Sequence, residues 1–438
     1  MSRRSLSSGL RGATFQRFWL GQSVSFFGTQ VTVVALPLVA VLTLDAKPAD
    51  MGLIVACETV PNLIGPAVLG NVVDRFDRRR LLLIADYGRL VSLLIVPAAE
   101  VTDRLSLPLL LGVAFSIGLF TVLNDIAFFS FLPSLVASAD LVRANAKLEG
   151  VRAVSQVAGP SAGGALTQGL GAGNALLADA ASYVFSVAQL HRIRSLVSQT
   201  AANSDRQPWY SGFRDMWRQP ALRLLAGGSG GFNFFAAGGI TLVALFLVDE
   251  VGLSPAAYGF GVAIGGLGGL AGASLADRLV DRLGTRTLLS TSPLLCGAAD
   301  AALVLIREPG VPAVAVLAGG QFLAATGVTV YVVVNAAIRQ RLITPELRGR
   351  VFGAMRLVTR GLMPLGGVVF GFAAELTGLR TTITMVAAGQ IAVGMVFRLR
   401  RRVLPDSTAA ERRGRSATRP RPVRYAPRHA RPRGAGVS

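Results

Sequence analysis

The sequence predicts an all-α membrane protein with twelve transmembrane helices in two six-helix bundles and both termini in the cytoplasm. Three observations support this fold class: composition, the length of the apolar runs, and an internal repeat. The 438 residues are 52% hydrophobic and 16% charged, with a mean hydropathy of +0.53. This composition is typical of a polytopic membrane protein and excludes an ordinary soluble enzyme.

Twelve apolar runs are long enough to cross about 30 Å of hydrocarbon as a helix of about 20 residues. The first six lie at 18–44, 51–72, 81–99, 107–131, 148–169 and 172–191, and the second six at 221–248, 256–276, 287–306, 312–338, 353–375 and 379–397. The first run is too long for a signal peptide and is interpreted as an uncleaved span. We therefore expect an N-terminal bundle at 1–191, a cytoplasmic linker at 192–220 and a C-terminal bundle at 221–398, followed by a tail.

The orientation follows from the basic residues, which gather in every second loop. These loops contain Arg75–Arg80, Arg143 with Lys147, the linker, Arg278–Arg286 and Arg339–Arg350, whereas the alternate loops hold only Lys47, Arg104, Arg307 and Arg380. Because positively charged loops stay on the cytoplasmic side, both termini and the linker are expected there.

The two halves of the chain repeat each other. Residues 74–79, Asp-Arg-Phe-Asp-Arg-Arg, are echoed by 281–286, Asp-Arg-Leu-Gly-Thr-Arg, and 160–164 by 364–367. Two related bundles with a substrate site between them near mid-membrane are the architecture of parallel-repeat transporters.

Much of the net charge of +20 lies in the tail, 399–438, which is rich in arginine and proline. Such a segment cannot bury a core, so it is expected to be disordered and to lie near anionic lipid headgroups. Nucleic-acid binding is the minority interpretation, and no nucleic-acid partner is expected.

Other chemistries have little support in the sequence. Cys57 and Cys296 lie far apart inside apolar runs, and the two histidines are His191 and His429, so no disulfide, metal site or hydrolytic triad is expected. No Gly-x-x-x-x-Gly-Lys-Ser/Thr motif occurs, which argues against an ATP-driven pump. We expect no enzyme activity, metal or cofactor.

The loop between the second and third runs contains a motif of glycine, then Asp-Arg, then two basic residues. Its positions are Gly70, Asp74, Arg75, Arg78 and Arg79. On this motif and the twelve runs, the chain resembles the major facilitator superfamily over about residues 15–398, in particular the bacterial drug:proton antiporter branch that includes macrolide and siderophore exporters. The resemblance implies that Asp74, Arg78 and Asp125 form a latch that closes the cytoplasmic side. The alternative is that these charges only anchor the spans.

The fifth run contains Gly159, Pro160, Gly163 and Gly164, which resemble the fifth-span motif of exporters, although the family's earlier glycine is replaced here. Relatives also often carry an acid after the first-span glycine, where this chain has Gly28 followed by threonine. If that acid couples protons in relatives, proton coupling is carried by another residue in this chain or is absent.

Proton coupling needs an acid within the spans that can exchange protons. Glu58, Asp300, Asp179 and Glu375 are the candidates, with Glu58 first because no basic residue lies within a helical turn of it. For each acid the alternative is a helix-packing hydrogen bond. Asp86 and Arg89, three residues apart, are expected to pair with each other.

The substrate cavity is expected from the first, fourth, seventh and tenth spans. The candidates are amide and aromatic side chains: Gln30, Phe26, Asn124, Asn233, Phe232, Tyr331 and Asn335. Sparse amides among aromatic rings suit a bulky amphipathic compound better than a sugar or a phosphate.

The sequence thus predicts a monomeric secondary exporter of small hydrophobic or amphipathic compounds in the bacterial cytoplasmic membrane, driven by proton antiport. Two alternatives remain open. One is a siderophore or metabolite exporter, or an importer, of the same fold; the other is a non-transporting scaffold or lipid-moving protein.

Overall fold

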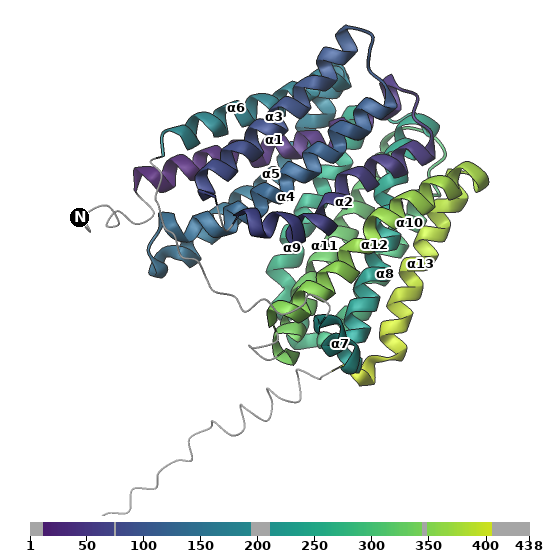
Figure 1. The fold of residues 1–438 in the computed structure, drawn as a ribbon. Helices are drawn as coiled ribbons and strands as arrows, with labels where there is room; N and C mark the ends of the chain where they lie inside the picture. The colour runs from purple at the N-terminus through teal and green to yellow at the C-terminus, as the bar shows by residue number, and fades with distance from the viewer. Residues whose placement is uncertain (1–11, 74–75, 194–210, 344–347, 405–438) are drawn as a thin grey trace, which may run out of the picture. The chain divides into compact units, whose positions relative to one another are not determined.

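The computed structural model describes residues 12–73, 76–193, 211–343 and 348–404, which belong to one compact unit (Figure 1). Thirteen α-helices occur in these residues. In the first half they are α1 (Ala13–Thr43), α2 (Pro48–Val73), α3 (Arg78–Val101), α4 (Leu107–Leu135), α5 (Leu141–Leu170) and α6 (Ala172–His191). The others are α7 (Ser211–Arg218), α8 (Pro220–Leu245), α9 (Pro255–Leu283), α10 (Thr285–Leu303), α11 (Val311–Leu342), α12 (Arg348–Thr377) and α13 (Leu379–Leu399). A π-helical turn, η4 (Phe246–Glu250), extends α8.

Each predicted apolar run coincides with one long helix, and only the short α7 has no counterpart among the runs. Within the described residues, eight helices are long and apolar enough to cross a membrane: α1, α3, α4, α8 with η4, α9, α11, α12 and α13. α5 is not among them: its first half is charged, and its uncharged second half, 153–170, is rich in glycine, serine and glutamine, which lower its mean hydropathy. The all-helical membrane fold is confirmed, whereas twelve spans and cytoplasmic termini stay predictions.

Two separate cores lie at one face of the unit, which we call the terminal face because α1 begins there and α13 ends there. The N-terminal core joins the start of α1 to the ends of α4 and α6, with Phe18 and Phe131 buried in it. The C-terminal core joins the starts of α8 and α12 to the end of α11, with Met355 buried in it. At this face, therefore, each half packs on itself.

At the opposite face both halves share one core. It contains Leu38 of α1 and Leu110 of α4 together with Leu242 of α8 and Phe370 of α12. Burial of apolar side chains is the main favourable term in packing. The two halves are therefore held together at the face opposite the termini.

Close backbone contacts accompany this shared core, where α2 packs on α12 and α5 packs on α9. A Cβ at Gly371 would lie 2.7 Å from the carbonyl oxygen of Pro48, and one at Gly164 would lie 3.0 Å from the Cα of Gly259. Only glycine permits helices to approach so closely. The contacts between the halves therefore depend on glycine at both crossings.

Parts of the predicted linker and tail pack against the C-terminal half. Met216 of α7 is completely buried in the C-terminal core. Beyond α13, Leu404 is 1% exposed, and its carbonyl oxygen accepts a hydrogen bond of 2.8 Å from Nε of Arg286. The packed region thus continues past residue 399, while the predicted disorder of the remaining tail falls on residues outside those described.

A truncation series tests this boundary. Ending the chain after residue 399 is expected to cost about 2 kcal/mol of stability, because it removes the buried Leu404 side chain and the acceptor for Arg286. Ending it after residue 405 should leave the melting temperature of the purified protein unchanged. Equal melting temperatures for the two truncations would show that residues 400–404 contribute nothing.

Candidate functional site

A buried ion pair lies at the centre of the N-terminal half. Arg89 and Asp86 on α3 contact each other, as expected from their spacing, with side chains 7% and 0% exposed. The Asp86 carboxylate also accepts hydrogen bonds from Oγ of Ser186 at 2.7 Å and from Nδ2 of Asn124 at 3.3 Å. The predicted pairing is confirmed, and it is embedded in a network that joins α3, α4 and α6.

Arg89 extends this network towards α1. Its guanidinium carbon lies 4.4 Å from the centre of the Tyr183 ring, a cation–π contact that desolvation strengthens. The hydroxyl oxygens of Tyr183 and Thr29 lie 3.0 Å apart. One arginine therefore links the polar groups of several helices inside the half.

Asp179 on α6 is buried against α1. Its carboxylate accepts hydrogen bonds from Thr32 at 2.6 Å and from Ser182 at 2.9 Å. Gly28 faces this pair so closely that any side chain there would overlap the carboxylate and Ser182. An acid is thus present beside the first-span glycine, although it comes from the sixth helix and not from the first.

Glu58 on α2 is the candidate acid without a fixed partner. Its side chain is exposed and makes no hydrogen bond or ion pair to another described residue. α2 packs against α4 in its own half and against α12 in the other. The carboxylate therefore lies on a helix that contacts both halves.

The other two predicted acids differ in environment. Asp300 on α10 accepts a hydrogen bond of 2.8 Å from Nε2 of Gln390 on α13, whereas Glu375 is exposed near the end of α12. Oε1 of Gln390 is buried without a partner in the described part of the chain. Asp300 therefore sits in a partly satisfied polar site within the C-terminal half.

The predicted latch is only partly within the described residues. Asp74 and Arg75 lie outside them, and Gly70 falls near the end of α2. Arg79 donates from Nε to the carbonyl oxygen of Leu190 at 2.8 Å and from Nη2 to that of His191 at 3.1 Å. Arg79 thus fastens the start of α3 to the end of α6, a contact that sequence reasoning missed. The latch itself stays a prediction.

Asp125 on α4 is surrounded by arginines from both halves. Arg152 of α5 and Arg89 of α3 act on it electrostatically from its own half, and Arg356 and Arg360 of α12 from the other. Arg152 also stacks on the Phe26 ring at 4.7 Å. Asp125 therefore has basic residues of both halves in its electrostatic surroundings.

The fifth-span motif is a packing surface with two sides. A Cβ at Gly163 would lie 2.9 Å from the carbonyl oxygen of Val31, and Gly159 is pressed against Gln30, both on α1. Gly164 faces the other way, towards Pro255 and Gly259 on α9, and the carbonyl oxygen of Pro160 lies against Gly259. The motif therefore joins α1 of its own half to the opposite half.

The predicted cavity residues separate into two groups. Asn124, Phe232, Tyr331 and Asn335 are buried, while Gln30, Phe26 and Asn233 are partly exposed. The buried amide of Asn335 donates to Ser229 at 2.9 Å, and the hydroxyl oxygens of Ser229 and Tyr331 lie 2.7 Å apart. Only the second group presents surface to a ligand in this conformation.

A comparison with protein families identifies the fold. The model of the transmembrane secretion effector family matches residues 5–431. The chain belongs to this family of major facilitator transporters. It is therefore a transporter and not an enzyme, and it is a multi-pass protein of the bacterial inner membrane.

Relatives and solved structures agree with this assignment. The multidrug efflux pump Tap of Mycolicibacterium fortuitum is 26% identical over 400 residues, covering 84% of this chain and 91% of that one. The MFS-type transporter YfiS of Bacillus subtilis is 23% identical over 383 residues, covering 86% of this chain and 90% of that one. A bacterial homologue of the iron transporter ferroportin, solved in an inward-facing state, superposes with a TM-score of 0.70 at 18% identity, covering 88% of this chain and 97% of that one. The last similarity shows the fold alone.

Among the described residues, no group of three or more His, Cys, Asp or Glu side chains lies close enough to hold a metal ion. The candidate site therefore consists of acids, arginines and amides, without a group of metal ligands among the described residues.

Proposed function

We propose that this protein exports small hydrophobic or amphipathic compounds by proton antiport, with access alternating between the two sides of the membrane. The observation that carries the proposal is the asymmetry of packing: one core shared by both halves at the face opposite the termini, and two separate cores at the terminal face. Relatives named as multidrug efflux pumps support the export direction.

This asymmetry of packing is what one end state of an alternating-access cycle requires. With basic loops on the terminal face, that face is assigned to the cytoplasm. The conformation described is then closed on the outer side and admits substrate from the cytoplasm. Opening the outer side requires the contacts of α2 with α12 and of α5 with α9 to separate.

The partly exposed candidate residues offer two amides and one aromatic ring to a ligand. Gln30 and Phe26 on α1 and Asn233 on α8 are partly exposed, and they come from both halves. A compound with a large apolar body and a few polar groups fits such a surface. We assign amphipathic compounds to it on this ground.

We assign proton coupling to Glu58. A carboxylate in a membrane helix without a partner is costly in hydrocarbon, so its position on a helix that contacts both halves favours a role in the transport pathway. Asp179 and Asp86 are held by fixed donors and are assigned to the structure of the half.

The assignment is tested in cells that express the protein. Adding a protonophore is expected to raise the accumulation of an amphipathic dye in wild-type cells, and Glu58→Gln should give that raised level without the protonophore. Glu375→Gln serves as the matched control and should export normally. Full export by Glu58→Gln would move the role to Asp300, and accumulation that never responds to the protonophore would refute proton coupling.

A further inference from the structure

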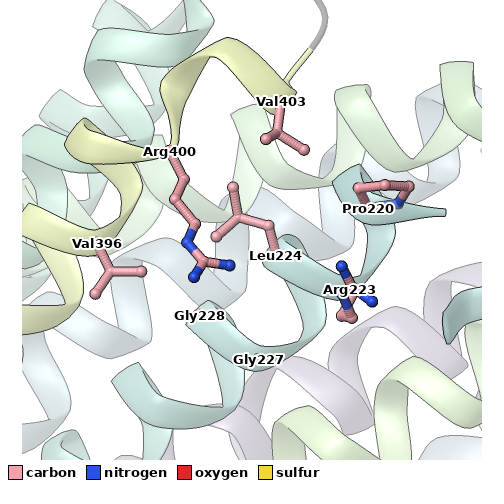
Figure 2. A pocket seen from close by; sticks show the side chains of 8 residues that line it. All are labelled: Pro220, Arg223, Leu224, Gly227, Gly228, Val396, Arg400 and Val403. Atoms are coloured by element: carbon pink, nitrogen blue, oxygen red, sulfur yellow. The ribbon is translucent and has the colours of Figure 1, made fainter.

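A pocket of about 290 Å³ lies between the start of α8 and the end of α13, at the terminal face (Figure 2). It is lined by Pro220, Arg223, Leu224, Gly227, Gly228, Val396, Arg400 and Val403. None of the acids, amides or aromatic residues of the candidate transport site contributes to it. The pocket is therefore separate from the transport site.

Two arginines give the pocket its charge. Figure 2 shows the guanidinium of Arg400 extending from the end of α13 towards α8, with Arg223 on the far side of Leu224. Both side chains are exposed, and neither makes a side-chain hydrogen bond or ion pair with another described residue. No acidic residue lines the pocket. The charge of the lining therefore favours an anion over a cation or a neutral group.

The remaining walls are apolar and belong to the membrane surface of the protein. α8 and α13 both meet the criterion for membrane spans. On α13, Met395 is 43% exposed, Val396 45% and Leu399 77%, so an apolar strip leads away from Arg400. An occupant must therefore present an anionic group to the arginines and hydrocarbon to this strip.

We propose that this pocket binds an anionic phospholipid, with its phosphate between Arg223 and Arg400 and an acyl chain along the exposed face of α13. Guanidinium groups bind phosphate through charge-assisted hydrogen bonds, often in pairs. Anionic headgroups are concentrated at the membrane surface on which basic segments lie.

Other occupants fit less well. The rest of the chain beyond the pocket, residues 405–438, has nine arginines against Asp406 and Glu411, so it would repel the pocket. A second pocket, lined by Val304, Leu305, Arg307 and Arg380, differs because Arg380 is occupied: its Nε donates to Glu250 at 2.8 Å and its Nη1 to the carbonyl oxygen of Val304 at 2.8 Å. Among the described residues, the second pocket thus has one arginine without a side-chain partner, Arg307, whereas the pocket between α8 and α13 has two, Arg223 and Arg400.

Native mass spectrometry of the full-length protein tests the proposal. After equilibration with phosphatidylglycerol or phosphatidylcholine of matched chains, the wild type is expected to retain one phosphatidylglycerol and no phosphatidylcholine. Arg400→Gln should weaken retention about tenfold, the effect of losing a charge-assisted hydrogen bond. Gly227→Leu should abolish retention, since Gly227 lines the pocket and nothing lies within 4 Å of a Cβ placed there, so the new side chain has room to extend into the pocket.

Matched controls separate this site from general attraction to lipid. Arg398→Gln removes an exposed arginine from the same helix outside the pocket, and Gly319→Leu adds a side chain at another glycine with open space, on α11. Both should retain the lipid. Equal retention of phosphatidylglycerol by wild type, Arg400→Gln and Gly227→Leu would overturn the site. Retention of inorganic phosphate as strong as that of phosphatidylglycerol would show that the ligand is a soluble anion and would overturn the lipid assignment.

Discussion

Replacing Arg89 by methionine is expected to destabilise the protein by about 3–5 kcal/mol. The reason is that Asp86, 0% exposed, would keep its negative charge in the interior without a cation. The cation–π contact with Tyr183 would be lost as well. The measurement is the unfolding free energy, or the melting temperature, of purified protein in detergent.

A double variant separates loss of the pair from loss of packing. Asp86→Asn combined with Arg89→Met removes both charges and should recover more than half of the loss, because a buried pair replaced by neutral groups often costs little. Arg143→Met is the control: its side chain is 77% exposed and lies 3.9 Å from Asp140, so it should cost about 1 kcal/mol or less. A stable Arg89→Met protein, or a double variant as damaged as the single one, would contradict this account of the network.

Replacing Gly164 by valine is expected to abolish transport by preventing closure of the face opposite the termini. A Cβ at this position would lie 3.0 Å from the Cα of Gly259 and 3.2 Å from the Cα of Ala256, in addition to overlapping the carbonyl oxygen of Pro255. These are backbone atoms of the opposite half, so no change of rotamer relieves the contact. The halves must move apart.

Disulfide cross-linking measures that separation. Oε1 of Gln168 accepts a hydrogen bond of 3.3 Å from the backbone N–H of Ala256 at the same crossing. Cysteines at 168 and 256 therefore report closure, once Cys57 and Cys296 are replaced by serine. Cross-linking should be at least tenfold slower with Gly164→Val. Gly169→Val, on the same helix with nothing within 4 Å of its Cβ, should cross-link and transport normally. Identical cross-linking in both would refute the role of this contact.

The local sequence pattern was sufficient to predict the helices and the Asp86–Arg89 ion pair. Apolar length alone placed every run in a long helix, because hydrocarbon leaves the backbone no other partner than itself. The spacing of Asp86 and Arg89 predicted their contact, because residues three apart share a helix face. Both inferences need only neighbouring residues.

Contacts between helices could not be predicted in this way. Nothing local indicates that Arg79 donates to the carbonyl groups at the end of α6, or that Asp179 lies against Gly28. Arg286 likewise meets Leu404 across 118 residues of sequence, which is why the packed region extends beyond residue 399. Such pairs depend on how the helices are arranged, which periodicity does not specify.

Proton-driven transport by the purified protein tests the central claim most directly. Proteoliposomes that contain the wild-type protein and an acidic interior should accumulate amphipathic dyes in the lumen, and the accumulation should collapse when the pH gradient is removed. Glu58→Gln proteoliposomes should not accumulate dye. Accumulation that is the same with and without the gradient, or the same in protein-free liposomes, would contradict export by proton antiport.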